Sequence, residues 1–218
     1  MESSSLFFSM RQMRSNKAHA AGPNVRCVRI WPLIRGVRRM NTKCPSILDI
    51  SKHLIGLPCW NVHQGYGSFL TFEFGNPEYF EPLVTNIEPE SLGSNPGQLT
   101  NNARGEWHLW IYCCAWFVSQ GGNKIAYGDS NHEEIKLACN ALEGQSLRDI
   151  KIGDNPGFTE FLFDHGGALS TSPYDDELNE HWMLFCPDGK VFTYRSDGAV
   201  SYESGNTEEG KEHWFPGA

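Results

Sequence analysis

The chain has 218 residues, of which 39% are apolar and 12% aromatic, and these supply enough side chains for the core of one domain. Its longest apolar run is far shorter than the roughly 18 residues of a membrane-spanning helix, which argues against a transmembrane segment. The net charge is −8, but residues 44–218 carry nine basic and 25 acidic groups. This balance disfavours binding to nucleic acid and favours a basic protein partner or another cation.

Residues 1–43 hold the other nine Lys and Arg, opposed only by Glu2. Three explanations stay open: an organelle-type targeting segment, a disordered basic tail, or upstream sequence translated from an early start, with Met40 as the natural first residue. We favour the last. In each case the prediction is a basic extension, disordered or non-native, that does not fold with the rest.

The sequence becomes regular after Pro45. Residues 46–55 begin with a serine cap, place apolar groups at 47, 50, 54 and 55, and stop at Gly56, a pattern typical of a short amphipathic helix. Residues 68–74 alternate as a strand does, with Phe69, Thr71 and Glu73 on one face and Leu70, Phe72 and Phe74 on the other, strongly apolar face. The proline-rich stretch 77–104 is predicted to be mostly loop, with a brief edge strand at 83–84.

The central region combines a strand, a hairpin and the main helix. Residues 107–118 form an unbroken apolar and aromatic run that predicts a strand, and a Gly-Gly-Asn turn at 121–123 leads to a partner strand at 124–127. Residues 130–142 start with cap residues and acids and continue with an apolar helical period. We therefore expect the main helix there.

Five strand-like runs follow Gly144, at 146–152, 158–163, 181–186, 190–195 and 199–202. The turns Pro187-Asp188-Gly189 and Ser196-Asp197-Gly198 join the last three runs into a meander. The sequence thus predicts an α+β fold, mainly an antiparallel sheet curled into a sandwich or partial barrel, with one main helix and a short N-terminal helix. It forms a single domain over 44–204, followed by a flexible acidic tail at 205–218.

The aromatic strand 107–118 offers the best candidate for a binding site. With a two-residue period, its odd positions form a uniform apolar row: Trp107, Leu109, Ile111, Cys113, Ala115 and Phe117. The even positions alone carry polar tips, and we select four of them as ligand-binding candidates: His108, Trp110, Tyr112 and Trp116. If strand 68–74 is a neighbour, Glu73 extends the same surface. The alternative is that the main helix covers this face and both rows are core.

Cys59 and His63 are a second candidate, as nucleophile and base, because a nearby imidazole lowers the pKa of a thiol. The competing interpretation is that Cys59 is a buried small hydrophobe. The histidines lack the spacing of a metal site, and no glycine motif matches a nucleotide loop, so we expect no metal and no cofactor. The seven cysteines have no repeating spacing, which indicates a reducing compartment and a cytoplasmic location.

Two segments, HLIGLPCWNVHQGYGSFLTFEFG and GEWHLWIYCCAW, resemble a group of bacterial proteins of unknown function. The resemblance covers most of residues 44–202 and omits the basic N-terminus. It implies no activity and no catalytic residue.

The sequence leaves the function open and does not decide whether the chain is an enzyme. Our first hypothesis is a non-enzymatic cytoplasmic binding protein with a basic protein partner, in one version an immunity-type antagonist of a basic toxin. The alternative is a small-molecule-binding protein or a small hydrolase-like enzyme whose pocket opens on the aromatic strand face. A purely structural domain is the third possibility.

Overall fold

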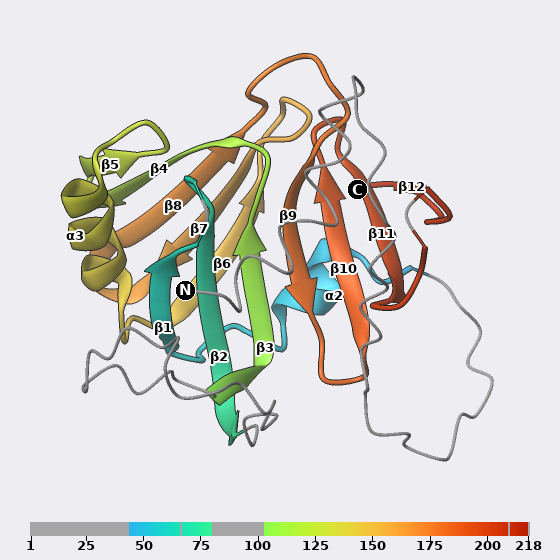
Figure 1. The fold of residues 1–218 in the computed structure, drawn as a ribbon, viewed down its shortest axis with the longest axis horizontal. Helices are drawn as coiled ribbons and strands as arrows, with labels where there is room; N and C mark the ends of the chain where they lie inside the picture. Colours follow the sequence, from blue (N-terminus) through green and yellow to red (C-terminus); the bar gives the residue numbers. More distant parts are fainter. Residues whose placement is uncertain (1–43, 66, 80–102, 209, 218) are drawn as a thin grey trace, which may run out of the picture.

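The computed structural model describes residues 44–65, 67–79, 103–208 and 210–217, drawn in colour in Figure 1. The predicted extension 1–43 and the edge strand at 83–84 lie outside the described residues. Within the described part, strands dominate, and they form two sheets of seven and five strands.

The larger sheet has the order β1-β2-β3-β9-β10-β11-β12. Its strands are β1 (Cys59–Gln64), β2 (Leu70–Tyr79), β3 (Ala103–Ile111), β9 (Glu180–Phe185), β10 (Lys190–Arg195), β11 (Ala199–Ser204) and β12 (Phe215–Pro216). The smaller sheet has the order β5-β4-β8-β7-β6, made of β5 (Asn123–Tyr127), β4 (Ala115–Gln120), β8 (Gly167–Ser172), β7 (Thr159–Phe163) and β6 (Leu147–Ile152). Each pairing described is antiparallel.

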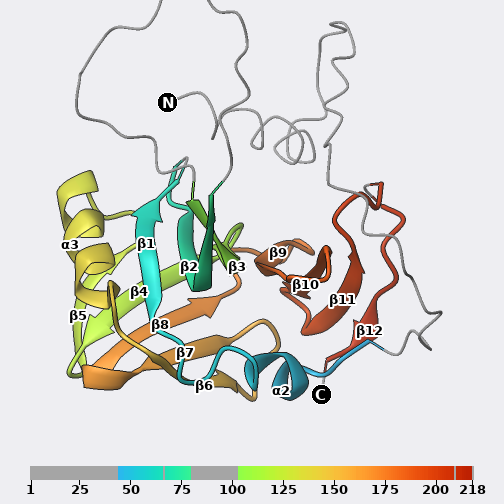
Figure 2. The same cartoon turned by 90° about the horizontal axis from the view of Figure 1, so that it is seen from below.

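The core lies between the two sheets, which Figure 2 shows as two layers. Aromatic rings meet across it: the centroids of Phe72 and Phe163 are 6.3 Å apart, and those of Phe161 and Trp182 are 5.5 Å apart. The predicted α+β fold with curled antiparallel sheets is therefore confirmed.

Two helices accompany the sheets in the described part of the chain. The helix α2 (Ile47–Ser51) begins with a capping box between Ser46 and Asp49, and it packs beside β6. It is shorter than the predicted 46–55, because the chain continues in turns from Lys52 to Gly56. The helix α3 (His132–Leu142) starts at the side-chain cap of Asn131 and flanks β1 and β5 (Figure 1). Its predicted position is confirmed. The 3-10 turn η3 (Asp164–Gly166) joins β7 to β8.

The predicted single strand 107–118 is wrong, because the chain leaves the larger sheet after Ile111 and enters the smaller one at Ala115. Figure 1 shows β3 ending near the top of one sheet and β4 starting in the other. The three residues between them shift the alternation by one. As a result the odd positions Leu109 and Ile111 face the core in β3, whereas the even positions Trp116 and Val118 face it in β4.

Two further differences concern strands that lack a strong sequence signal. β1 falls in a stretch for which no element is predicted, and β8 contains glycine and alanine, which are depleted in strands. The tail predicted to be flexible also differs, since Phe215 and Pro216 pair with β11 as β12. The guanidinium of Arg195 lies 4.3 Å from the ring centroid of Trp214 and holds this returning segment.

Candidate functional site

The outer face of the larger sheet, opposite the core, carries two rows of side chains that run across the strands. One row follows the register Trp60, Glu73, His108, Phe185, Val191 and Glu203. The next row follows His63, Thr71, Trp110, Met183, Thr193 and Ser201. Neither of the two described helices covers this face, because α3 lies at the flank of the sheet and α2 on its core side (Figure 2).

Glu73 and His108 form the centre of this surface. The Oε1 atom of Glu73 lies 2.5 Å from Nδ1 of His108, and its Oε2 atom accepts a 2.8 Å hydrogen bond from the backbone N–H of Gly105. Only 4% of Glu73 and 8% of His108 is exposed. Both carboxylate oxygens are thus held in place, and the imidazole is oriented by the carboxylate.

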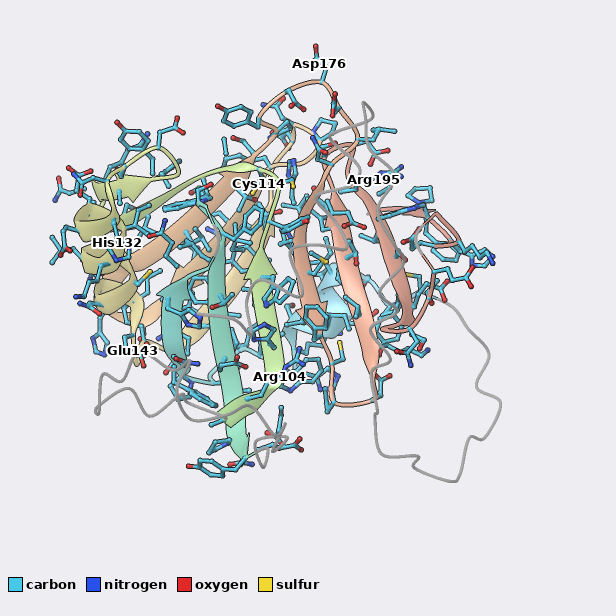
Figure 3. The ribbon with its side chains drawn as sticks, viewed as in Figure 1. Arg104, Cys114, His132, Glu143, Asp176 and Arg195 are labelled. Carbon is cyan, nitrogen blue, oxygen red and sulfur yellow. The ribbon has the colours of Figure 1, made fainter. Side chains whose placement is uncertain are left out.

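Aromatic side chains surround the imidazole. The ring centroid of His108 lies 5.5 Å from those of Trp110 and Phe185, which are 5.1 Å from each other. The guanidinium of Arg104 lies 4.9 Å from the ring centroid of Phe185, at the lower end of β3 in Figure 3. Trp60, Trp110 and Phe185 are only partly buried, so aromatic surface is accessible around the buried carboxylate.

Burial lowers the pKa of His108 below its ordinary value, because the interior disfavours the charged imidazolium. The hydrogen bond and the charge of Glu73 act in the opposite direction, whereas the charges of Arg104 and His63 add to the lowering. The balance favours a neutral imidazole.

The structure brings together three of the five predicted ligand-binding residues, namely Glu73, His108 and Trp110. Tyr112 lies at the end of the sheet, where its ring centroid is 4.5 Å from that of Phe69. Trp116 belongs to the core of the smaller sheet, and its indole N–H donates to the carbonyl of Ser68 at 2.6 Å. The break after Ile111 is the reason, since it turns the later even positions inward.

The pair Cys59 and His63 is not brought together. The thiol of Cys59 is fully buried and donates to the carbonyl of Leu142 at 3.0 Å. Burial, reinforced by the charge of Glu143, raises its pKa to about 12. The ring of His63 lies on the outer face, 2.8 Å from the carbonyl oxygen of Asn61 and 3.1 Å from the hydroxyl of Thr71.

The irregular backbone between these two residues explains their separation. Asn61 has a positive φ of 51°, and the pairing of β1 with β2 shifts between Trp60 and His63. The carboxylate of Glu143, labelled in Figure 3, accepts hydrogen bonds from the backbone N–H groups of Asn61 and Val62 and so fixes this shift. A buried thiol with a raised pKa is a poor nucleophile, so the geometry gives no support to the nucleophile and base hypothesis.

Sequence reasoning missed Trp60, Arg104 and Phe185 as members of the site. Trp60 falls in a stretch for which no element is predicted, and Arg104 lies in the segment predicted to be mostly loop. Phe185 lies in a predicted strand whose neighbours could not be deduced. Only the order of the strands in the sheet would have identified Phe185. β9 pairs with β3, which is distant in the sequence, and this pairing places Phe185 opposite His108.

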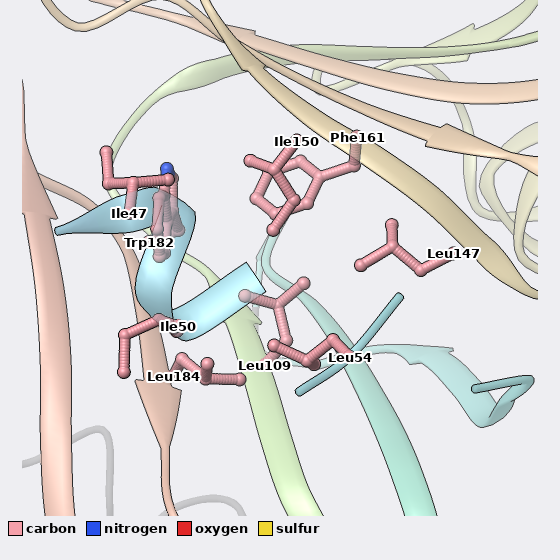
Figure 4. A pocket seen from close by; sticks show the side chains of 9 residues that line it. All are labelled: Ile47, Ile50, Leu54, Leu109, Leu147, Ile150, Phe161, Trp182 and Leu184. Atoms are coloured by element: carbon pink, nitrogen blue, oxygen red, sulfur yellow. The ribbon is translucent and has the colours of Figure 1, made fainter. Parts of the chain in front are cut away.

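A small cavity lies on the other side of the sheet, in the core beneath α2 (Figure 4). Its lining is entirely apolar and includes Ile50, Leu54 and Trp182. With a volume of about 10 Å³, it has room for one water molecule at most. A polar ligand would find no hydrogen-bond partner in this cavity. The cavity is also distinct from the pocket that the alternative hypothesis expects on the aromatic strand face.

Comparison with protein-family models, with curated proteins and with solved structures gave no match. The resemblance to uncharacterised bacterial proteins therefore stays a prediction. Among the described residues, no helix has the length and hydropathy needed to span a membrane. In the same part of the chain, no group of three or more His, Cys, Asp and Glu side chains is arranged to hold a metal ion.

Proposed function

We propose that the protein is a non-enzymatic binding protein that recognises a basic protein partner on the outer face of the larger sheet. The observation that carries the proposal is the carboxylate of Glu73, held by His108 and the N–H of Gly105 among partly exposed aromatic rings. A lysine or arginine side chain has the charge and the shape that such a group of residues would recognise. It pairs with the carboxylate and lies over a tryptophan or phenylalanine ring.

The charge of the described residues supports the same class of partner. They contain 21 acidic and nine basic side chains, and an acidic protein attracts a basic partner during diffusional encounter. An immunity-type antagonist of a basic toxin is one concrete version. Cytoplasmic location belongs to the proposal, because the described cysteines are all free thiols, which suits a reducing compartment.

The Glu73→Gln variant is expected to bind a fluorescent nona-arginine peptide about tenfold more weakly than the wild type, because it keeps the shape of the side chain and removes its charge. Fluorescence anisotropy with the full chain measures the difference. The control is Glu133→Gln, since Glu133 is an exposed carboxylate on α3, away from the proposed surface. Equal weakening in both variants would mean that the peptide senses only the overall negative charge.

The immunity-type version has a separate test in native lysate of the source organism. The wild-type chain should capture a basic protein, and Glu73→Gln should not. Capture that is the same with both variants, or no capture together with no toxin-like gene beside this one, would count against that version.

Small-molecule binding is the second candidate, and the contact between Glu73 and His108 favours it. A carboxylate that orients one imidazole nitrogen leaves the other able to accept a proton from a ligand. In a thermal-shift screen of metals and metabolites, a ligand of this site should raise the Tm of the wild type and not that of His108→Ala, each relative to its own ligand-free Tm. Equal shifts in both proteins would place the ligand elsewhere, and the absence of any shift would remove the idea.

A further inference from the structure

Three connections meet at the end of the molecule where β9 begins: residues 153–158 between β6 and β7, residues 173–179 between β8 and β9, and residues 196–198 between β10 and β11. Figure 3 labels Asp176 at the tip of the second connection. The connections are acidic and solvent-exposed, with Asp154, Asp175, Asp176 and Glu177 all on the surface.

His181 lies beneath these connections and is fully buried. Its Nδ1 atom is 2.9 Å from the carbonyl oxygen of Gly157, so Nδ1 carries the proton and donates it to the first connection. Its Nε2 atom is also buried and has no hydrogen-bond partner in the described part of the chain. The neutral ring is therefore accommodated, whereas a second N–H on Nε2 would find no acceptor.

Contacts with Gly157 show how tightly the three connections are held together. This glycine has a φ of +78°, and a Cβ atom built on it would lie 2.4 Å from the carbonyl oxygen of Ser196 and 3.0 Å from Cε1 of His181. The hydroxyl of Ser196 donates to the carbonyl of Glu177 at 2.8 Å, and the backbone N–H of Ser196 donates to Asn179 at 2.8 Å. Movement of His181 away from Gly157 would thus affect all three connections.

The charged and titratable groups around His181 come from every element that meets there. The connections contribute Asp154 and Asp175, β10 and its turn contribute Tyr194 and the ion pair of Arg195 with Asp197, and the link between β3 and β4 contributes Tyr112 and Cys114. Of these, Asp175 acts on His181 through its charge and favours the imidazolium, as does the hydrogen bond to Gly157, but burial outweighs both and lowers the pKa of His181.

We propose that His181 is an acid-sensitive latch: the neutral ring holds residues 153–158 and 173–179 against β9, and protonation of the ring releases both connections. The direction in which stability changes with pH follows from the linkage between proton binding and folding. Because folding lowers the pKa of His181 below its ordinary value of 6.5, the stability that the neutral ring supplies is complete above that pH. It is lost as the pH falls through the folded-state pKa. The latch is independent of the proposed binding surface.

Hydrogen–deuterium exchange of the full chain, corrected for the intrinsic pH dependence of exchange, tests the latch between about pH 7.5 and pH 5. In the wild type, the protection of peptides from 153–158 and 173–179 should fall by up to about tenfold per pH unit between about pH 6.5 and the folded-state pKa, and level off below it. Peptides from α3 should change far less. A wild-type protein whose connections stay as protected as α3 would overturn the proposal.

His181→Asn is the decisive variant, because asparagine keeps an N–H near the position of Nδ1 and does not titrate. Its connections should lose no protection at acid pH. The control His213→Asn removes an exposed histidine and should behave as the wild type does. The same acid response in His181→Asn as in the wild type would assign the transition to another group.

If His181→Asn does not fold, NMR titration of the histidine rings in the wild type tests the latch instead. The amide signals of both connections must then change with the apparent pKa of the His181 ring. A loop transition displaced from that titration by more than about one pH unit would contradict the latch. Neither result depends on the outcome of the peptide-binding test of Glu73, so the two proposals can fail independently.

Discussion

Replacement of Trp182 by alanine is expected to lower the free energy of unfolding by about 3 to 5 kcal/mol. Trp182 is 1% exposed and lies at the centre of the core, with ring centroids of Phe161, Phe192 and Tyr194 at 5.5, 5.5 and 5.3 Å. Its indole N–H also donates to the hydroxyl of Thr159 at 3.1 Å. The variant therefore leaves a cavity, enlarges the existing void beneath α2 and deprives a buried hydroxyl of its partner.

Urea denaturation followed by far-ultraviolet circular dichroism measures this loss. Leu137→Ala is the matched control, because Leu137 is 62% exposed on α3 and alanine favours a helix. We expect a change within about 0.5 kcal/mol for the control. A loss of less than about 1 kcal/mol for Trp182→Ala would contradict the placement of this side chain between the sheets.

The second large effect is expected for Gly105→Ala, with a loss of at least about 2 to 3 kcal/mol. A Cβ atom on Gly105 would lie 2.5 Å from the carbonyl oxygen and 2.8 Å from the backbone nitrogen of Phe74. These are backbone atoms of the neighbouring strand, so β2 and β3 must separate to make room. The separation also breaks the hydrogen bond from Gly105 to Glu73, and binding of the nona-arginine peptide should weaken with it.

Gly65→Ala is the control for this substitution. Among the described residues, a Cβ atom there would meet atoms of Phe69, at 3.7 and 3.8 Å, which is ordinary van der Waals contact. Its stability should stay within about 0.5 kcal/mol of the wild type or rise slightly, because alanine restricts the unfolded chain. Thermal unfolding of both variants compares them directly, and equal Tm values would show that β2 and β3 can separate without cost.

Much of the fold could be predicted from local patterns. The cap of Asn131 and the buried positions after it define α3, and the glycines of the two Asp-Gly turns have φ values of 79° and 81°, as tight hairpins require. These signals are contained in a few consecutive residues. The division of 107–118 into two strands could not be predicted in this way. An unbroken apolar run carries no local signal at the point where the chain passes from one sheet to the other.

The candidate site, too, could be predicted from local patterns only in part. Alternation along 68–74 and 107–110 correctly places Glu73, His108 and Trp110 on one face of the sheet. It cannot show that β9 is the other neighbour of β3 and brings Phe185 beside the imidazole. It also fails for Cys59 and His63, because the backbone at Asn61, with its positive φ, is held by the carboxylate of Glu143, the residue that follows α3.

The pairing of the C-terminal segment with β11 affects how readily one copy of the protein can add a strand to the sheet of another copy. An open strand edge is a template on which another chain can add a strand. At the first two residues of β11, Ala199 and Val200, that edge is occupied by Pro216 and Phe215, and proline offers no N–H to a further strand. Phe215 and Pro216 thus cover the start of this edge of the larger sheet and hinder intermolecular β-pairing there.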